Sequence, residues 1–334
     1  MSSLDSNITT PSQISIHPKS TSSLASHHLI YYITGNPGLI GYYNIFLQSL
    51  HPLLGASDPQ VIYHIHGQSL AGFVDVPSDT RTTPYSLEEQ IVFALSTLQS
   101  QRIPSGPQEG QHYQNVILIG HSVGSYILLE LIKRLGKSSP VKIKAGILLF
   151  PTITHIAKSP SGVRLSTLFR IPNFPKKVEA VGKALIVLAP GNALRWLVGF
   201  VARMPREAAE VTTLFLRSRM GVWQALHMAK DEMDVITEDR WDDDIWGAEH
   251  EDLVTQSEAP KLIFYFGQND HWVADHTRDA LIAARSRQEG ATKSSKPVML
   301  IDNSGIPHGF CIRHSETVAE KVGLWINELT ADTW

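Results

Sequence analysis

One pentapeptide constrains the fold of this chain more than any other feature. Gly120-His121-Ser122-Val123-Gly124 follows the apolar run 115–120, which has the composition of a buried strand, and precedes the stretch 126–135, which has the pattern of a helix. A sharp turn from a strand into a helix leaves room only for small residues beside its serine. The sequence therefore predicts a nucleophile elbow at Ser122, with Gly120 and Gly124 as its small neighbours.

Apolar runs that end in Gly, Thr or Pro recur before and after this motif. Stretches with helical spacing separate them, at 42–54 and 87–99, and Ser86 with Glu89 predicts a capping box at the start of the second. Alternating strands and helices are typical of an α/β fold with a mostly parallel sheet flanked by helices. The strands that we expect are 28–34, 61–67, 116–120, 144–150, 261–266 and 298–302.

The composition fits a globular protein and excludes several other classes. The chain has 334 residues, of which 43% are hydrophobic and 18% charged, so it can bury a full core and is not a disordered, collagen-like or coiled-coil chain. A net charge of -3 argues against a dedicated nucleic-acid-binding protein, which needs a strongly basic surface. The single cysteine, Cys311, cannot form an internal disulfide or a thiolate zinc site, which fits a reducing, cytosol-facing location.

Three regions follow from the patterning. Residues 1–28 contain 12 Ser or Thr and lack the apolar stretch of a secretory signal, so we expect a disordered tail. Residues 29–153 and 259–334 carry the alternation of strands and helices and form the expected core. The alternation stops in residues 154–258, which we interpret as a helical cap or lid inserted between two halves of one sheet.

Within this insertion, residues 184–202 form an apolar segment whose only charged residue is Arg195. Pro190-Gly191-Asn192 interrupts the segment, and a spanning helix needs about 20 consecutive apolar residues, so we expect no membrane span. Two interpretations remain: two short apolar arms that enter a membrane surface from one side, or two amphipathic helices that close over the core. Residues 158–206 hold nine Lys or Arg against one acid, which favours an anionic lipid surface.

Two backbone N–H groups are candidates for an oxyanion hole. The N–H of Val123 stands at the start of the helix that follows Ser122. The second donor in this architecture comes from the loop after an earlier strand, and Thr34-Gly35-Asn36-Pro37-Gly38 occupies that place. We therefore expect the N–H groups of Asn36 and Val123 to bind a developing oxyanion, with an ordinary Gly–Pro turn as the alternative interpretation of the loop.

A nucleophilic serine needs a histidine to accept its proton and an acid to orient that histidine. In the chain order Ser, acid, His, the acid follows a late strand and the histidine follows the last one, which selects Asp270 and His308. The competing acids are Asp275, a turn further into the next predicted helix, and Asp302, which is still at a strand end. We prefer Asp270 because it alone stands in the loop beyond a strand.

Other histidines have less specific interpretations. His64 and His66 alternate on one predicted strand in the manner of a metal-binding pair, but no third ligand accompanies them. We expect a half-buried strand there, no metal site and no organic cofactor. His121, inside the elbow, is expected to pack beside the nucleophile.

Several of these stretches resemble a known family, the lipid droplet-associated hydrolases. The most specific are Asn36-Pro37-Gly38-Leu39-Ile40-Gly41-Tyr42-Tyr43 and Phe150-Pro151-Thr152-Ile153, and Asn269-Asp270-His271-Trp272 with Ile306-Pro307-His308-Gly309 extends the likeness over residues 29–316. The resemblance implies an α/β-hydrolase fold with a cap and a triad of Ser122, Asp270 and His308. It also implies residence on lipid droplets and the endoplasmic reticulum through the hydrophobic insertion, with sterol ester or another neutral lipid as substrate.

Taken with the resemblance, the sequence predicts a serine hydrolase that cleaves carboxylic esters of neutral lipids, of the sterol ester or acylglycerol type. It would act on the cytosolic face of a lipid droplet or the endoplasmic reticulum, which it would contact through residues 184–202. No nucleic-acid partner is expected, and the sequence indicates no particular protein partner. Two alternatives stay open: a droplet surface protein with little catalytic activity that governs droplet size or clustering, and a soluble hydrolase of a thioester or peptide bond.

Overall fold

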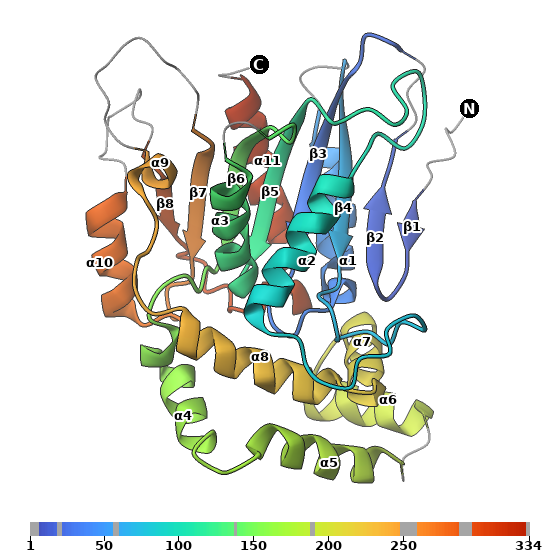
Figure 1. Ribbon diagram of the computed structural model, residues 1–334, viewed down its shortest axis with the longest axis vertical. Coiled ribbons are helices and arrows are strands. Elements are labelled where there is room, and N and C mark those ends of the chain that lie inside the picture. The colour runs from blue at the N-terminus through green and yellow to red at the C-terminus, as the bar shows by residue number, and fades with distance from the viewer. Residues whose placement is uncertain are drawn as a thin grey trace.

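The computed structural model describes residues 7–18, 22–55, 60–136, 139–187, 191–247, 259–286 and 296–331. Its strands are β1 (Ile8–Thr9), β2 (Gln13–Ile16), β3 (Ser26–Ile33), β4 (Val61–Gln68), β5 (Asn115–His121), β6 (Ile143–Leu149), β7 (Lys261–Phe266) and β8 (Val298–Ile301). They form an eight-stranded sheet in the order β1-β2-β4-β3-β5-β6-β7-β8 (Figure 1). From β4 to β8 neighbouring strands are parallel, whereas β1 and β2 pair antiparallel at the β4 edge.

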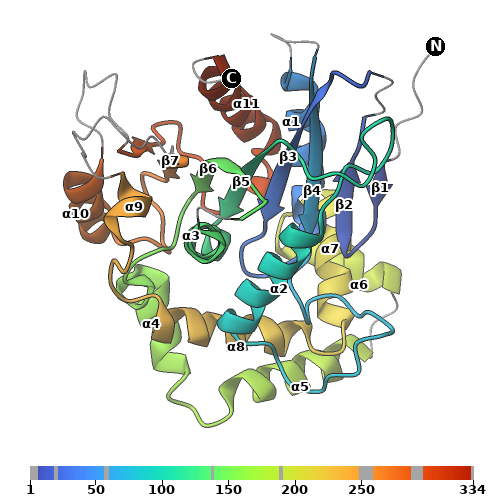
Figure 2. The same ribbon diagram turned by 45° about the horizontal axis from the view of Figure 1, so that its top comes forward.

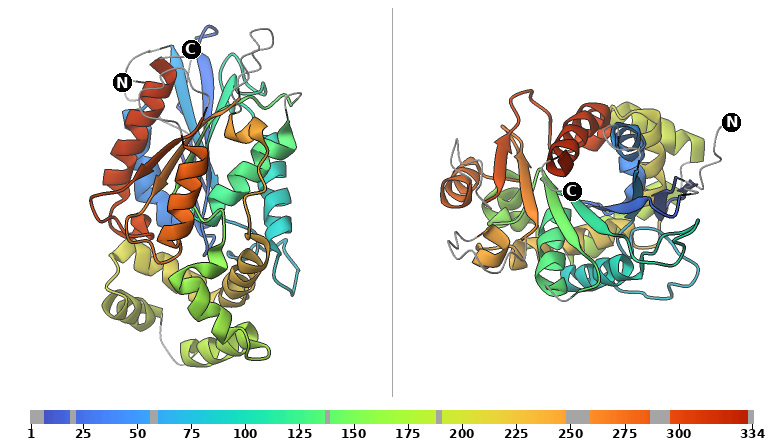
Figure 3. Two further views of the ribbon diagram at one scale, coloured as in Figure 1. Left: turned by 90° about the vertical axis from the view of Figure 1, so that its left-hand side faces the viewer. Right: turned by 90° about the horizontal axis from the view of Figure 1, so that it is seen from above.

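Helices cover both faces of this sheet (Figure 2, Figure 3). α1 (Asn44–Leu50) and α11 (Ser315–Ala331) pack on one face, and α2 (Leu87–Ser100), α3 (Val123–Leu135) and α10 (Asp275–Arg285) lie on the other. Each face has its own apolar core because successive strand residues point to opposite sides, as Leu29 and Ile30 of β3 do. The predicted α/β fold is confirmed. Short 3₁₀ helices are η1 (Ile40–Tyr43), η2 (His51–Leu53), η3 (Ile156–Lys158) and η4 (Phe310–Ile312).

The start of α2 follows the sequence prediction in detail. The Ser86 hydroxyl accepts a hydrogen bond from the Glu89 N–H, and the Glu89 carboxylate accepts one from the Ser86 N–H. This reciprocal pair is the predicted capping box, and it satisfies two N–H groups that the helix itself leaves without a partner.

The prediction of a disordered tail over residues 1–28 is wrong for the part that the structure describes. β2 pairs with β4 from Gln13↔Gln68 to Ile16↔Ile65, and Ile14 and Ile16 are buried. The Ser/Thr-rich composition hides an alternation of polar and apolar residues in β2 that suffices for an added strand at the sheet edge. Residues 1–6 and 19–21 of the predicted tail lie outside the described residues.

The connection between β6 and β7 falls in residues 154–258, the region interpreted as an insertion, and its described part is largely helical. Most of its helices form a layer at the carboxyl edge of the sheet, which we call the cap (Figure 1, Figure 3). The cap helices are α4 (Pro160–Leu168), α5 (Phe174–Val187), α6 (Gly191–Val201), α7 (Arg206–Arg217) and α8 (Gly221–Val235). The short α9 (Asp243–Trp246) packs instead against the core, with Trp246 stacked on Phe264 of β7.

The apolar segment 184–202 divides between two of these helices. α5 ends at Val187 and α6 begins at Gly191, while Pro190 of the predicted break lies outside the described residues. In the described part of the chain, no helix has the length and apolar character needed to cross a membrane.

Candidate active site

Ser122 occupies a strained turn between β5 and α3. Its backbone has φ 54° and ψ -123°, a conformation that non-glycine residues rarely adopt. A Cβ atom added to Gly120 would lie 2.4 Å from the carbonyl oxygen of Gly124, and one added to Gly124 would lie 2.4 Å from that of Ile33. Neither position can therefore hold a side chain, and the two glycines surround Ser122 as the sequence predicts.

The backbone of the turn is fixed by hydrogen bonds to its neighbours. The Ser122 N–H donates to the Leu149 carbonyl of β6 at 3.0 Å, and the Ser125 N–H donates to the Ser122 carbonyl at 2.9 Å. The Ser125 hydroxyl donates to the Gly120 carbonyl at 2.9 Å. These bonds offset the local strain and hold the Ser122 side chain at the carboxyl edge of the sheet, under the cap.

Ser122, His308 and Asp270 form a hydrogen-bonded row. His308 Nε2 lies 2.9 Å from Ser122 Oγ, and His308 Nδ1 lies 2.6 Å from Asp270 Oδ2. Because the carboxylate oxygen only accepts, Nδ1 carries a proton and donates, which leaves the lone pair of Nε2 directed at the serine hydroxyl. The second oxygen, Asp270 Oδ1, accepts the Trp272 N–H at 2.8 Å.

The environment of Asp270 keeps this carboxyl ionised although it is buried. Burial raises the pKa of Asp270, but the charge and hydrogen bond of His308 and the N–H of Trp272 outweigh it, so that the pKa lies below its ordinary value. An anionic Asp270 orients His308 and would stabilise its positive charge after proton transfer.

The two competing acids have other partners. Asp302 accepts the Tyr265 hydroxyl at 2.6 Å and the Ile306 N–H at 2.7 Å, and these bonds shape the loop that leads to His308. Asp275 is exposed and forms an ion pair with Arg278 at 2.9 Å. Of the three candidate acids, Asp270 is the one that the structure places against His308.

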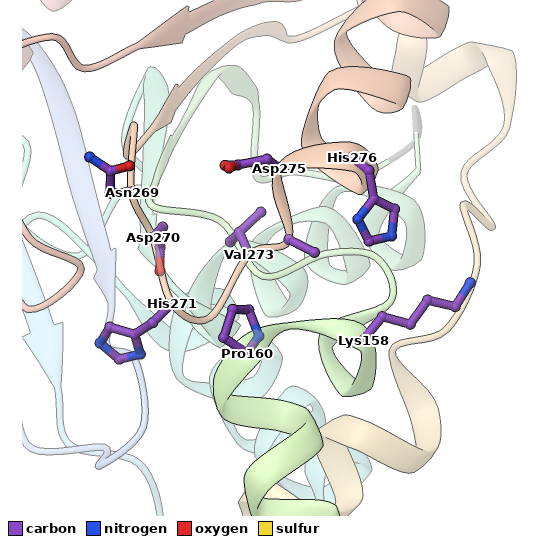
Figure 4. Close-up of a pocket in the computed structure, with 9 residues that line it drawn as sticks. Lys158, Pro160, Asn269, Asp270, His271, Val273, Asp275 and His276 are labelled. Carbon is purple, nitrogen blue, oxygen red and sulfur yellow. The ribbon is translucent and has the colours of Figure 1, made fainter.

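An open depression adjoins the loop that carries Asp270, where this loop meets the cap helix α4 (Figure 4). Pro160 of α4 and Asp270, His271 and Val273 of the loop contribute to its lining. Beside it, Ser161 Oγ of α4 lies 2.7 Å from His271 Nδ1, and the Ser161 N–H donates to the His271 carbonyl at 2.9 Å. The cap is therefore attached to the loop that holds the acid of the row.

The loop after β3 lies against Ser122. A Cβ atom added to Gly35 would stand 3.1 Å from Ser122 Cβ, so only glycine allows this approach. The next residue, Asn36, turns its side chain toward the cap: Nδ2 donates to Glu232 Oε1 and to the Ala225 carbonyl of α8, both at 2.9 Å. The structure thus brings the Asn36 loop beside the nucleophile, and the binding of an oxyanion by the N–H groups of Asn36 and Val123 stays a prediction.

A second hydrogen-bonded chain, which the sequence does not reveal, links this loop to His308 through His121. The Gly35 N–H donates to the Tyr43 hydroxyl at 3.1 Å, which lies 2.8 Å from His121 Nδ1, and His121 Nε2 lies 2.9 Å from the His308 carbonyl oxygen. Because that carbonyl only accepts, Nε2 carries the proton of His121 and Nδ1 accepts from Tyr43.

His121 remains neutral in this chain of bonds. Burial, together with the charge of His308, lowers the pKa of His121 to about 3. The sequence predicts that His121 packs beside the nucleophile. It gives no sign of the two polar contacts, because Tyr43 and His308 are distant in the chain.

His64 and His66 are more deeply buried than the predicted half-buried strand suggests. Two further histidines gather at His64: His17 Nδ1 lies 3.3 Å from its Nδ1, and His27 Nδ1 lies 2.8 Å from its Nε2. The two neighbours therefore use opposite nitrogens of His64, which is the pattern of a hydrogen-bonded row and not of ligands around one ion. Within the described ranges, no group of three or more His, Cys, Asp or Glu could hold a metal ion.

Comparison with known proteins shows which family this chain is similar to. A family model described as lipid-droplet associated hydrolase matches residues 26–311. The lipid droplet-associated hydrolase of Rattus norvegicus is 27% identical over 313 residues, which cover 90% of this chain and 85% of that protein. The protein of the same name from Dictyostelium discoideum is 25% identical over 317 residues, with coverage of 92% and 90%.

Solved structures resemble the chain in fold. A peroxisomal α/β-hydrolase of Saccharomyces cerevisiae superposes with a TM-score of 0.60 at 13% identity, covering 100% of this chain and 87% of that one. A lipase-esterase related protein of Clostridium acetobutylicum has a TM-score of 0.52 at 11% identity, covering 92% and 97%. The sheet, its flanking helices and these neighbours establish an α/β-hydrolase fold, as the resemblance in sequence implies.

Proposed function

The chain belongs to the lipid-droplet associated hydrolase family, and from this premise we propose that it is a serine hydrolase of neutral-lipid carboxylic esters. The observation that carries the chemistry is the row of Ser122, His308 and Asp270 at a strained elbow. The substrate class is a sterol ester or an acylglycerol, met at the cytosolic face of a lipid droplet or the endoplasmic reticulum.

Acyl transfer to the enzyme follows from the roles of these residues. Ser122 Oγ adds to the ester carbonyl carbon as His308 Nε2 takes the hydroxyl proton, and Asp270 stabilises the resulting imidazolium. The N–H groups of Asn36 and Val123 bind the negative oxygen of the tetrahedral intermediate. The bond from carbon to the alcohol oxygen then breaks, His308 returns its proton to that oxygen, and the alcohol leaves an acyl-enzyme on Ser122.

Water completes the cycle by the same route. His308 Nε2 takes a proton from a water molecule as its oxygen adds to the acyl carbon, and a second tetrahedral intermediate forms. Its collapse breaks the bond to Ser122 Oγ, which regains the proton from His308, and the fatty acid is released. Each step uses side chains that the fold already holds within hydrogen-bond distance.

Apolar side chains take part in the buried contact between the cap and the core, which supports an apolar ester as the substrate. Met228 and Met233 of α8 belong to the same buried apolar cluster as Leu39, after β3, and Ile153, after β6. Side chains of this kind exclude water from a reacting ester and favour a hydrocarbon chain over a polar substrate.

Contact with a lipid surface is supported by α6. This helix buries Leu194 and Val198 against Ala209 of α7. Its opposite side exposes Trp196 and Phe200 at 67% and 70%, with the two aromatic rings stacked. A helix that is apolar on both sides needs a second apolar environment, and aromatic residues are favoured at lipid interfaces. We propose that this side of α6 enters the droplet surface.

The chemistry is tested by labelling the purified protein with a fluorophosphonate, which reacts with activated serines. We expect the wild type to label and Ser122→Ala not to label, because the attacking oxygen is gone. His308→Ala should slow labelling by at least about 10³-fold, since the general base is lost. Labelling that survives in Ser122→Ala at the wild-type rate would disprove the assignment.

The substrate class needs a second assay, in which cholesteryl oleate and triolein emulsions are compared with a soluble p-nitrophenyl ester. Release of fatty acid from either emulsion, abolished in Ser122→Ala, supports a neutral-lipid hydrolase. Hydrolysis of the soluble ester alone would point to another substrate. A wild type that neither labels nor hydrolyses any of them would favour a droplet surface protein whose site is idle.

A further inference from the structure

Glu232 is a buried acid with an unusual position on α8. It is 4% exposed, and its Oε1 accepts the hydrogen bond from Asn36 Nδ2 at 2.9 Å. The ion pairs found among the described residues do not include Glu232, so no cation offsets its burial there. Burial, together with the charge of Asp231, outweighs the lowering effect of the Asn36 hydrogen bond and raises the pKa of Glu232 to about 8, which leaves the carboxyl neutral near pH 7. An acid in such a place costs free energy, and its one described side-chain hydrogen bond is with Asn36.

Asn36 links this contact to the reacting atoms. It follows Gly35, which packs against Ser122, and its own N–H is the expected oxyanion donor. The side chain of Asn36 donates only toward α8, to Glu232 and to the Ala225 carbonyl. Two acceptors on one helix thus fix the side chain, and with it the orientation of the peptide groups on either side.

α8 itself is a firm platform. The Gln224 side chain forms two hydrogen bonds with the main chain of Tyr85, one from the Tyr85 N–H at 2.7 Å and one to its carbonyl at 2.9 Å. The Asp231 carboxylate accepts the Leu87 N–H at 2.9 Å. α8 is therefore held against the core at points independent of Asn36.

We propose that Glu232 is a positioning residue for the oxyanion hole: by holding the Asn36 side chain, it aims the Asn36 main-chain N–H at the ester oxygen. The cap then takes part in catalysis and does more than cover the site. This role rests on the proposed function, because it presumes acyl transfer at Ser122. It differs from a purely structural role in that its loss lowers the rate of the chemical step more than the stability of the fold explains.

The expected size of the effect follows from oxyanion-hole energetics. Removal of one such donor typically lowers kcat by 10² to 10³, and a misdirected donor should lose part of that. Glu232→Leu leaves Asn36 Nδ2 with the Ala225 carbonyl alone, so we expect kcat to fall about 10- to 100-fold with KM changed little. Glu232→Gln keeps an acceptor oxygen at the same place and should restore most of the lost kcat.

Gln224→Leu is the matched control, because Gln224 is a fully buried anchor of the same helix whose described side-chain hydrogen bonds go to Tyr85 and not to Asn36. Hydrolysis of p-nitrophenyl butyrate and thermal unfolding are measured for each variant. If Glu232 acts by aiming the Asn36 N–H, Gln224→Leu should lower the Tm but reduce kcat far less than Glu232→Leu does. Equal loss of kcat in Gln224→Leu and Glu232→Leu would overturn it, since loosening of α8 would then explain both.

Asn36→Ala tests the same contact from the core side and does not depend on the folding of Glu232→Leu. It should lower kcat to a similar degree, and the double variant Asn36→Ala/Glu232→Leu should lose no more than either single variant. Full additivity, or wild-type kcat in both single variants, would overturn the proposal alone. A wild type that neither hydrolyses the ester nor labels with a fluorophosphonate would overturn the proposed function and this inference with it.

Discussion

Two helices of the cap, α8 and α6, meet the rest of the molecule in opposite ways. α8 turns polar side chains inward: Gln224 and Glu232 are buried and form hydrogen bonds with the core. α6 makes an apolar contact with α7 and turns Trp196 and Phe200 outward, at 67% and 70% exposure. Of these two helices, α8 is the one that forms hydrogen bonds with the Asn36 loop beside Ser122.

The difference matches the two tasks proposed for the cap, positioning of the Asn36 loop and contact with lipid. Directional hydrogen bonds fix the register of α8 on the core, as a site that must hold atoms in place requires. Apolar side chains on α6 carry no such directionality, which suits a fluid lipid surface without fixed partners. A firm inner part and an apolar outer part in one cap agree with the proposed function, in which the substrate comes from a lipid surface.

The largest expected effect that distinguishes the two helices is a dependence of stability on pH, caused by Glu232 of α8 and without a counterpart on α6. The pKa of Glu232 is raised by burial from 4.5 to about 8. Its neutral form therefore contributes fully below pH 4.5, and the contribution is lost as the pH rises toward 8, because the unfolded chain ionises first. Between pH 5 and 8 the free energy of unfolding should fall by about 3 kcal/mol relative to Glu232→Gln.

Urea unfolding of the wild type and Glu232→Gln at several pH values measures this difference directly. The Gln variant has no proton to release at this position, so all other titrating groups cancel in the comparison. Parallel stability curves for the two proteins would show that Glu232 is not held neutral by the cap. The double variant Trp196→Ser/Phe200→Ser should follow the wild-type curve, since α6 has no part in this titration.

Much of the core and the central row of the site could be predicted from the sequence. The strands are short apolar runs with local start and stop signals, and the elbow at Ser122 needs glycines at fixed spacing, which steric crowding enforces. Asp270 and His308 follow from chain order, because loops at the carboxyl ends of parallel strands converge on one edge. These inferences need only local patterns and a known topology.

Contacts between the cap and the core could not be predicted in this way. Asn36 and Glu232 have no local pattern in common, and their hydrogen bond depends on how α8 packs across the sheet edge. The hydrogen bonds that link Tyr43, His121 and His308 within the core also join residues without a common local pattern. β2 cannot be predicted for another reason: polar residues dominate the N-terminal composition, and a run of only four alternating residues is stable as a strand because it pairs with β4.

The next effect in size is a loss of lipid binding when the exposed aromatic residues of α6 are replaced. Trp196→Ser/Phe200→Ser should lower partitioning onto phosphatidylcholine–phosphatidylserine vesicles and triolein droplets by about 100-fold, because a buried aromatic side chain contributes roughly 1.5–3 kcal/mol. Leu324→Ser on α11 is the control, since Leu324 is similarly exposed, at 63%, on a helix of the core. Flotation in a density gradient measures the partitioning. Unchanged flotation of the double variant would assign lipid contact to another surface.

The smallest expected effect concerns α8, where a substitution should lower stability and leave lipid binding unchanged. Gln224→Leu leaves the N–H and carbonyl of Tyr85 without their partners, and unsatisfied buried polar groups cost about 1–3 kcal/mol. We expect the free energy of unfolding to fall by about 2 kcal/mol while vesicle flotation of the folded protein stays at the wild-type level. Urea unfolding and flotation on one preparation check both halves. A variant that loses lipid binding as well would show that α8 and α6 act as one rigid unit, and the division of the cap into a positioning part and a lipid-contacting part would have to be given up.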